Sequence, residues 1–349
     1  MPRLPPSLFW RARREISPMA TLLLPACRDL QSAANELRWI REHVQDTHSP
    51  IPPSLRVWRL CEKRGKGIPL QYVLGTQPFG DLEIMCQPGV LIPRPETETY
   101  TLHLASLLSK EPHPSSFSIL DLCTGTGCIP LLLTHTLLNP PNPPPSPIHI
   151  STLGIDISAR SVHLSRLNLQ HNTRLGHFPP QVCRNIAFHQ ADIFSPTFLP
   201  FLHSQSQPQR WDILTANPPY ISSAGFSRDT ARSVRNHEPR RALVPDPQAV
   251  TGYGSCRLED VFYARLLEIA VQLKPRRVLL EVGGWEQAGR VVGMLGSGAE
   301  REYKLVEIWR DEPGGGNGRV ERMEIGGKEV VVRGVGKGRS VYLERAEGE

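Results

Sequence analysis

The sequence has few of the features that mark a disulfide-stapled, metal-binding or membrane-spanning protein. Its seven cysteines are scattered, odd in number and without any C-x-x-C pair, which argues against a disulfide framework or a zinc site and indicates a reducing compartment. The twelve histidines form no H-x-x-x-H cluster, so no metal is expected. No apolar run approaches the roughly 18 to 20 residues that a membrane span requires, so no membrane association is expected.

Charge is also a weak signal. The formal net charge of +6 and the pI near 9.0 are compatible with an acidic partner such as ribosomal RNA, but the charge is spread thinly over 349 residues. Hydrophobic residues at 39% and charged residues at 21% are typical of a globular protein, and the length favours two domains.

The first 28 residues are rich in arginine and contain a single acid, Glu15. Starts of this kind are typical of mitochondrial transit peptides, so we predict one over residues 1–25 and a location in the mitochondrial matrix. A disordered basic tail is the alternative.

The next stretch predicts a small helical domain over residues 26–75. Residues 29–44 place apolar side chains at helical spacing behind Asp29, a suitable N-cap, and a second helical piece covers residues 55–61. A turn with flanking alternation predicts a β-hairpin within a linker over residues 76–95. Residues 96–349 are then expected to form the large domain.

From residue 118 onward, predicted strands alternate with predicted helices, which indicates an α/β fold with a doubly wound, mostly parallel sheet. Two stretches interrupt the pattern: a proline-rich spacer at 139–147, and glycine-rich and basic residues at 314–318 and 326–339. The second is interpreted as a solvated loop that lengthens the final hairpin, with an RNA-facing loop as the alternative. The seven expected strands are residues 118–123, 149–156, 186–191, 212–216, 278–282, 303–309 and 340–343.

The stretch TANPPY at 215–220 closes a short apolar run and carries the strongest chemical signal. Pro218 and Pro219 hold Asn217 in an extended conformation, because each proline ring excludes the helical region for the residue before it. The Asn217 side-chain oxygen and the Pro218 carbonyl are two acceptors for an amine nitrogen, and the Tyr220 ring is a wall beside them. The alternative is an ordinary exit from a strand into a turn.

Three further strand ends carry groups suited to a nucleoside-containing ligand. The glycine-rich turn at 123–127 follows the first strand but is neither G-x-G-x-x-G nor a P-loop. Asp156 ends the second strand, where a carboxylate can bind both hydroxyls of a ribose, a device that NAD enzymes share. Asp192 and Ile193, after the third strand, suit the edge and face of an adenine, although Asp192 is also a candidate turn cap.

Together these motifs resemble the class I S-adenosylmethionine-dependent methyltransferases, which have a Rossmann-like fold. More narrowly, residues 65–310 resemble the HemK/PrmC family, which methylates the side-chain amide of the glutamine in the Gly-Gly-Gln motif of peptide chain release factors. The motifs that carry this narrower resemblance are residues 92–98 (IPRPETE), 120–127 (LDLCTGTG), 217–221 (NPPYI) and 238–239 (EP) before Ala242 and Leu243.

The resemblance implies S-adenosylmethionine as cofactor and a release factor as protein substrate. We expect no direct readout of nucleic acid, and a monomer is the default for the oligomeric state. Cys123 stands where the family usually has glycine, which brings the closeness of the backbone to the cofactor into question. By this resemblance Asn217, Pro218 and Tyr220 are catalytic, and the glutamine contacts are Asn217, Pro218, Pro219 and Tyr220. The cofactor contacts expected are Cys123, Thr124, Gly125, Thr126, Gly127, Asp156, Asp192, Ile193 and Asn217.

Two other functions fit parts of the pattern. The same grip on an amine nitrogen serves N6-adenine methyltransferases acting on DNA or RNA, although no base-recognition domain is evident and the 93–95 entry is rigid. A catalytically silent cofactor-binding assembly factor is the second, and the intact NPPY motif argues against it.

Overall fold

The computed structural model describes residues 3–110, 116–140, 148–205, 210–248, 252–253, 256–296, 302–316 and 320–345. Most of the predicted proline-rich spacer, residues 141–147, and part of the glycine-rich stretch, residues 317–319, lie outside the described residues. No helix within these ranges is both long and apolar enough to cross a bilayer.

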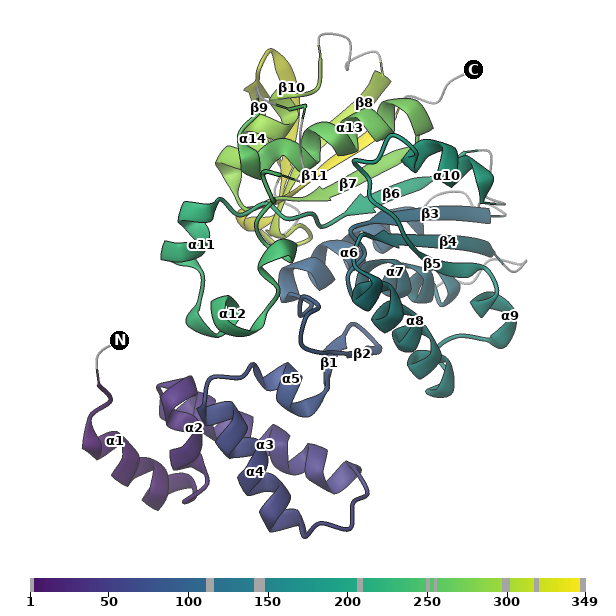
Figure 1. The fold of residues 1–349 in the computed structure, drawn as a ribbon. Coiled ribbons are helices and arrows are strands. Elements are labelled where there is room, and N and C mark those ends of the chain that lie inside the picture. Colours follow the sequence, from purple (N-terminus) through teal and green to yellow (C-terminus); the bar gives the residue numbers. More distant parts are fainter. Residues whose placement is uncertain are drawn as a thin grey trace.

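The N-terminal part is a helical unit that stands apart from the sheet, drawn in purple in Figure 1. Asp29 accepts a hydrogen bond from the Ser32 backbone N–H at 2.7 Å, which confirms the predicted N-cap. The helices are α1 (Pro6–Arg11), a π-helical turn (Ala12–Ile16), α2 (Ala20–Cys27), α3 (Leu30–Asp46) and α4 (Pro53–Gly65).

The arginine-rich start contributes to the core of this unit. Leu23 and Leu24 of α2 are fully buried and lie in one apolar cluster with Leu37 and Ile40 of α3. Part of the segment predicted as a transit peptide is therefore packed inside the helical unit.

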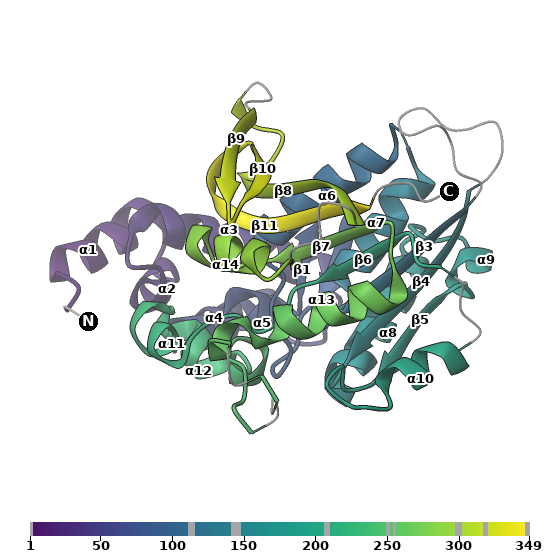
Figure 2. The ribbon, with the colours of Figure 1, turned by 90° about the horizontal axis from the view of Figure 1, so that it is seen from above.

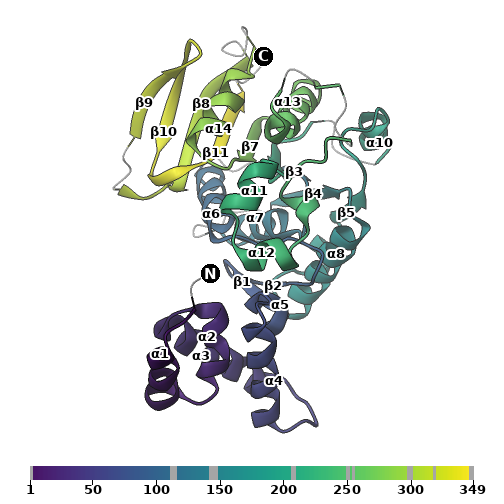
Figure 3. The same ribbon diagram turned by 60° about the vertical axis from the view of Figure 1, so that its left-hand side comes forward.

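The short helix α5 (Leu70–Leu74) leads into the predicted hairpin, which is confirmed as β1 (Thr76–Phe79) and β2 (Leu82–Met85). Two buried asparagines of α8 fasten this hairpin to the sheet domain. Asn168 accepts from the Met85 N–H at 2.7 Å, and Asn172 accepts from the Glu83 N–H at 3.0 Å. Figure 3 shows α5 and the hairpin between the helical unit and the sheet.

The large domain is built on a nine-stranded sheet in the order β5-β4-β3-β6-β7-β11-β8-β10-β9. The five strands from β5 to β7 are parallel, and β11 runs antiparallel to both of its neighbours. All seven predicted strands are present. The strands are β3 (Ser116–Leu122), β4 (His149–Asp156), β5 (Ile186–Gln190), β6 (Ile213–Ala216), β7 (Arg277–Glu281), β8 (Tyr303–Glu312), β9 (Val320–Ile325), β10 (Lys328–Arg333) and β11 (Val335–Arg345).

Helices cover both faces of the sheet, as Figure 2 shows, and each face has its own apolar core. This confirms the doubly wound α/β architecture. One face carries α6 (Pro95–Leu108), α7 (Cys128–Leu138) and α8 (Ala159–Arg174), and the other carries α10 (Phe198–Ser204), α13 (Val261–Leu273) and α14 (Trp285–Gly293). The remaining helices are the short α9 (Pro180–Cys183), α11 (Ser223–Asp229) and α12 (Arg232–His237).

The prediction of a loop over residues 326–339 is wrong. Gly326 and Gly327, with φ of 60° and 78°, turn the chain between β9 and β10, and the two strands extend the sheet beyond the seven expected. Val330 and Val332 lie on one face of β10, with Val331 between them on the other face, and both are buried in the core. Burial of this one apolar face makes the segment a strand despite its basic composition.

Candidate active site

The register of the parallel strands aligns four strand ends at one edge of the sheet. Leu122 of β3 pairs with Ile155 of β4 and with Ala216 of β6, and Ala216 pairs in turn with Leu280 of β7. Ligands of open α/β sheets collect at such carboxyl ends. The residues that follow these positions along the four strands are Cys123, Asp156, Asn217 and Glu281.

A cavity of about 480 Å³ opens at this edge. The linker contributes Leu91 to its wall, and the segment after α12 contributes Arg241 and Asp246. The cavity brings together most of the residues predicted from the sequence: Cys123, Gly125, Asp156, Asp192, Ile193, Asn217 and Pro219.

Five predicted residues do not line this cavity. Thr124 and Thr126 are 5% and 3% exposed and lie behind the glycine-rich turn, where the Thr126 carbonyl accepts from Asn168 at 2.9 Å. Thr124 and Thr126 therefore pack beneath the turn, and neither residue lines the cavity. The remaining three are Gly127, Pro218 and Tyr220.

Gly125 and Gly127 of the glycine-rich turn are required for different structural reasons. Gly125 has a φ of 56°, and a Cβ placed on it would meet no atom within 4 Å, so its backbone faces open space. A Cβ on Gly127 would come within 3.1 Å of Phe188 and Ser165, so this glycine is required by packing. Cys123 also has a left-handed φ, 62°, which costs a residue with a Cβ roughly 1 kcal/mol.

The Asp156 carboxylate is fixed by two backbone donors. The Gly125 N–H donates to Oδ2 at 2.9 Å and the Ser158 N–H donates to Oδ1 at 2.8 Å. Burial raises the pKa of Asp156, and these two hydrogen bonds oppose that rise. Each carboxylate oxygen has lone-pair capacity left for a ligand hydroxyl.

The next wall of the cavity combines a polar turn with aromatic rings. Asp192 Oδ1 accepts from the Phe194 N–H at 2.9 Å, so Asp192 caps the turn and also lines the cavity. The rings of Phe194 and Phe262 meet edge to face, with centroids 5.0 Å apart, and both line the cavity. This wall suits a flat, partly polar ring system.

Asn217 is oriented by a buried acid. Its Nδ2 donates to Glu281 Oε2 at 2.8 Å, so its Oδ1 is left as the end of the carboxamide available to a ligand. The Tyr220 hydroxyl donates to Glu281 Oε1 at 2.9 Å, and its carbonyl accepts from Gln287 at 3.2 Å. Glu281 was not among the residues predicted from the sequence. The feature that could have indicated it is an acidic residue at the end of an otherwise apolar strand.

A second buried acid, Asp121, lies beneath the glycine-rich turn and is fully buried. The Thr215 hydroxyl donates to Asp121 Oδ1 at 2.6 Å. Among the described residues, neither Asp121 Oδ2 nor Thr124 Oγ1 has a hydrogen-bond partner. Burial raises the pKa of Asp121 to about 7.

The IPRPETE segment closes the site from the linker side. Arg94 donates to Glu238 at 2.8 Å, and the Ile92 N–H donates to the same carboxylate at 3.1 Å. The Glu238 side chain is only 1% exposed. These contacts tie the linker to the segment after α12, and both segments line the cavity.

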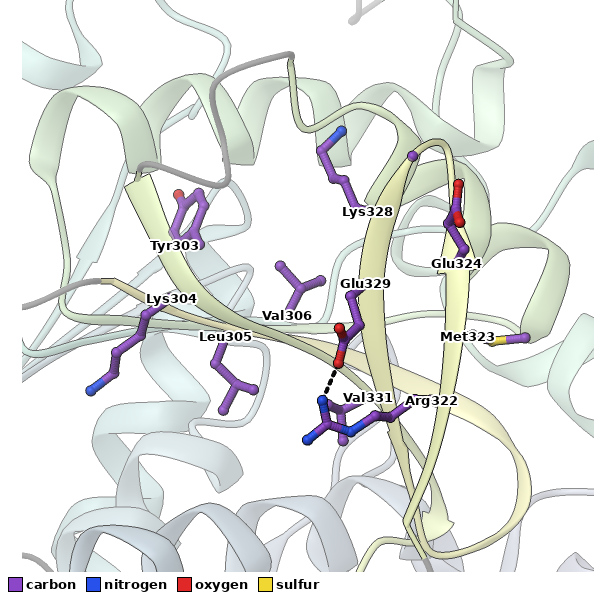
Figure 4. A pocket seen from close by; sticks show the side chains of 11 residues that line it. Tyr303, Lys304, Leu305, Val306, Arg322, Met323, Glu324, Lys328, Glu329 and Val331 are labelled. Carbon is purple, nitrogen blue, oxygen red and sulfur yellow. Dashed lines mark hydrogen bonds and ion pairs between the residues drawn. The ribbon is translucent and has the colours of Figure 1, made fainter.

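A second hollow, of about 930 Å³, lies between β8 and the β9–β10 pair and is shown in Figure 4. Its wall mixes acidic and basic side chains, among which Arg322 and Glu329 form an ion pair. It contains none of the predicted site residues. Within the described ranges, no three His, Cys, Asp or Glu side chains gather as a metal site would require.

No family model matches the chain. Solved structures with a similar fold include the N-terminal domain of human METTL16 in complex with SAH, at 15% identity and a TM-score of 0.45, with 80% of this chain and 82% of that chain covered. A METTL16 methyltransferase domain without its N-terminus has a TM-score of 0.43, and the alignment covers 80% of this chain and 95% of that chain. Similarity at this level carries no argument about function.

Curated relatives are much closer in sequence. The mitochondrial MRF1 N(5)-glutamine methyltransferase MTQ1 of Saccharomyces cerevisiae is 37% identical over 75% of this chain and 76% of its own length. A probable MRF1 mitochondrial N(5)-glutamine methyltransferase of Schizosaccharomyces pombe is 33% identical over 69% and 73%. The release factor glutamine methyltransferase of Haemophilus influenzae is 29% identical over 81% and 85%.

These relatives confirm the predicted enzyme class and the resemblance on which it rested. The alignments span more than two thirds of both chains. The chain belongs to the family of release factor glutamine methyltransferases.

Proposed function

We propose that the chain transfers the methyl group of S-adenosylmethionine to the side-chain amide nitrogen, N5, of the glutamine in the Gly-Gly-Gln motif of a mitochondrial release factor. The observation that carries the proposal is the position of Asn217, whose free Oδ1 belongs to the same cavity as Gly125 and Asp156. The names of the two yeast relatives support a mitochondrial release factor as the substrate.

The residues present fit the proposed cofactor. The open space beside Gly125 admits a ligand close to the backbone, the fixed Asp156 carboxylate suits ribose hydroxyls, and Phe194 suits an adenine face. When bound there, S-adenosylmethionine supplies an electrophilic methyl group on a sulfonium centre.

Asn217 is the main residue that we propose activates the amide nitrogen of the substrate. An amide nitrogen is a poor nucleophile because its lone pair is delocalised into the carbonyl. In this proposal Asn217 Oδ1, which belongs to the cavity, accepts one N–H hydrogen, and the carbonyl of Pro218, which is buried next to the cavity wall, accepts the other. The two acceptors favour a pyramidal nitrogen and aim its lone pair at the donor methyl. The same oxygens stabilise the positive charge that develops on nitrogen, and the proton leaves afterwards, when that nitrogen is acidic.

Tyr220 and Pro219 complete the proposed substrate contacts. Pro219 lines the cavity, while the Tyr220 hydroxyl is engaged with Glu281. We therefore propose that Pro219 forms the wall beside the substrate glutamine. We also propose that the Tyr220 ring packs near the plane of the glutamine amide, as the sequence predicted. Catalysis then depends on positioning and on fixed dipoles and needs no strong base.

We also propose that the protein acts in the mitochondrial matrix, as a monomer and without reading a nucleic-acid sequence. The names of the yeast relatives support the organelle. A fluorescent fusion imaged in cells and light scattering of the purified protein test the location and the monomer.

Methyl transfer to matched substrates tests the function. The purified protein is incubated with S-adenosylmethionine and a mitochondrial release factor, and mass spectrometry locates a gain of one methyl on the Gly-Gly-Gln peptide. A release factor with Gly-Gly-Ala in place of Gly-Gly-Gln is the control. Methylation of an adenine-containing oligonucleotide but not of the release factor would favour the N6-adenine alternative, and the absence of turnover on both would favour an assembly factor.

A further inference from the structure

The buried carboxylate of Glu281 accepts three hydrogen bonds, which come from two separate segments. Thr97 Oγ1 of α6 donates at 2.6 Å, Asn217 Nδ2 at 2.8 Å and the Tyr220 hydroxyl at 2.9 Å. Glu281 is 2% exposed, so it is sealed from solvent behind the cavity rather than part of its wall. No substrate or cofactor contact is available to it there.

The pattern of these bonds fixes which end of the Asn217 carboxamide faces the cavity. A carboxylate accepts hydrogen bonds and cannot donate them, so the Nδ2 end of Asn217 must face Glu281. If the carboxamide rotated by half a turn, two oxygens would face each other in a buried site. That arrangement costs the desolvation of both groups.

The charge of Glu281 has a second effect. A hydrogen bond from Nδ2 to a carboxylate polarises the Asn217 carboxamide and makes Oδ1 a stronger acceptor. Burial raises the pKa of Glu281, whereas the hydrogen bonds that its carboxylate accepts and the charge of Arg339 lower it. The Tyr263 hydroxyl donates to the Glu281 carbonyl at 2.7 Å.

We infer that Glu281 is a positioning residue for methyl transfer, which aims Asn217 Oδ1 at the substrate amide and ties the IPRPETE segment, through Thr97, to the NPPY motif. The inference rests on the proposed function and adds to it a residue that touches neither ligand. It explains in physical terms why two motifs about 120 residues apart serve one reaction.

Two substitutions separate orientation from charge. In Glu281→Gln the side-chain oxygen can still accept from Asn217 and Thr97, while its amide donates to the Tyr220 oxygen, which reverses that bond. The orientation of Asn217 is therefore kept and the charge is lost. In Glu281→Leu both are lost. We expect kcat to fall about tenfold in Glu281→Gln and by at least about 100-fold in Glu281→Leu. KM for S-adenosylmethionine and calorimetric binding of S-adenosylhomocysteine stay within about twofold, because Asp156 and Gly125 are untouched.

Glu307 provides a matched control. It is also a buried carboxylate of the sheet, 1% exposed, and bonds Trp309 and Arg333 away from the cavity. We expect Glu307→Gln to lower thermal stability while kcat of the folded protein is unchanged.

Equal rates in the Glu281 variants and the unaltered enzyme, or equal losses in Gln and Leu, would overturn the inference. So would a loss of S-adenosylhomocysteine binding by both variants, which would indicate a general structural role. If Glu281→Leu does not fold, Thr97→Val replaces it, with a fall in kcat of about tenfold expected. Failure of the unaltered enzyme to methylate the release factor would reject the proposed function instead, so the two failures are distinguishable.

Discussion

Asn217 is the residue on which the proposed chemistry depends most directly. Replacing it with alanine removes the Oδ1 acceptor while Gly125 and Asp156 remain in place. We expect Asn217→Ala to abolish methylation, with a fall in kcat of about 1000-fold or more, and to weaken cofactor binding only modestly. Single-turnover methylation and calorimetric titration with S-adenosylhomocysteine measure the two effects.

Asp156→Ala is the contrasting substitution. It removes the carboxylate that we propose binds the ribose and leaves Asn217 intact, so the loss should be in cofactor affinity and should be partly restored by raising the cofactor concentration. Near-normal turnover in Asn217→Ala, or an unchanged titration curve in Asp156→Ala, would contradict the proposed division of the site.

Asp121 predicts a pH dependence of stability. Its pKa is raised in the folded protein from the ordinary 3.8 to about 7, so between these values the folded state binds the proton more tightly than the unfolded chain. The contribution of Asp121 to the free energy of unfolding is therefore fully present below pH 3.8 and is lost as the pH rises towards 7. We expect Asp121→Asn to be more stable than the unaltered protein at pH 8, by roughly 4 kcal/mol, and to show no gain near pH 4.

Thermal unfolding without cofactor, at several pH values, measures this difference. The asparagine can still accept from Thr215 and can donate towards Thr124, so folding is retained. A difference in melting temperature that does not change between pH 4 and pH 8 would show that Asp121 does not titrate in this range.

A functional residue at a strand end could be predicted when the sequence indicated both the strand and a ligand that such a side chain is known to bind. Asp156 was found because an acid after a parallel strand is a known ribose contact, and it lies at the cavity. Glu281 occupies the equivalent place on β7, yet it binds only protein atoms, and no ligand chemistry pointed to it. Its importance depends on register and on side-chain hydrogen bonds, which the sequence does not contain in readable form.

At the scale of elements, α2 tests where the helical unit begins. We propose that this unit starts near residue 6 rather than 26, because Leu23 is fully buried against α3. Leu23→Ala should lower the free energy of unfolding by about 2 to 5 kcal/mol through the cavity that it leaves. Denaturant unfolding measures the change.

Trp10→Ala is the control, since Trp10 is 71% exposed and its loss should leave stability nearly unchanged. A Leu23→Ala protein as stable as the control would show that α2 is dispensable and would favour the original boundary at residue 26.

Some strands of the sheet could be predicted from the sequence, and β9 and β10 could not. Buried runs such as 278–280 are apolar on both sides, because helices cover both faces, and they were recognised as strands. In β9 and β10, charged side chains such as Glu321 and Lys328 interrupt the apolar residues, and glycines flank both strands. Only the packing of Val330 and Val332 on the core distinguishes them from a solvated loop.

At the scale of the whole molecule, the Arg94–Glu238 pair connects the linker to the segment after α12. Arg94→Met leaves a carboxylate that is 1% exposed without its cation, and we expect the free energy of unfolding to fall by about 3 kcal/mol. The double variant Arg94→Met, Glu238→Leu should lose less than the sum of the two single variants. Denaturant unfolding of all four proteins completes the cycle, and strict additivity would show that the pair is not coupled.

Strand β9 forms one end of the order of the sheet, so its outward backbone groups are the ones that another chain could pair with. Val320 and Met323 are exposed there, at 47% and 44%, yet Arg322 stands between them and forms an ion pair with Glu329. Charge placed on such a strand discourages edge-to-edge stacking into aggregates. The charged side chains that interrupt the apolar residues of this strand thereby protect the protein from polymerising through it.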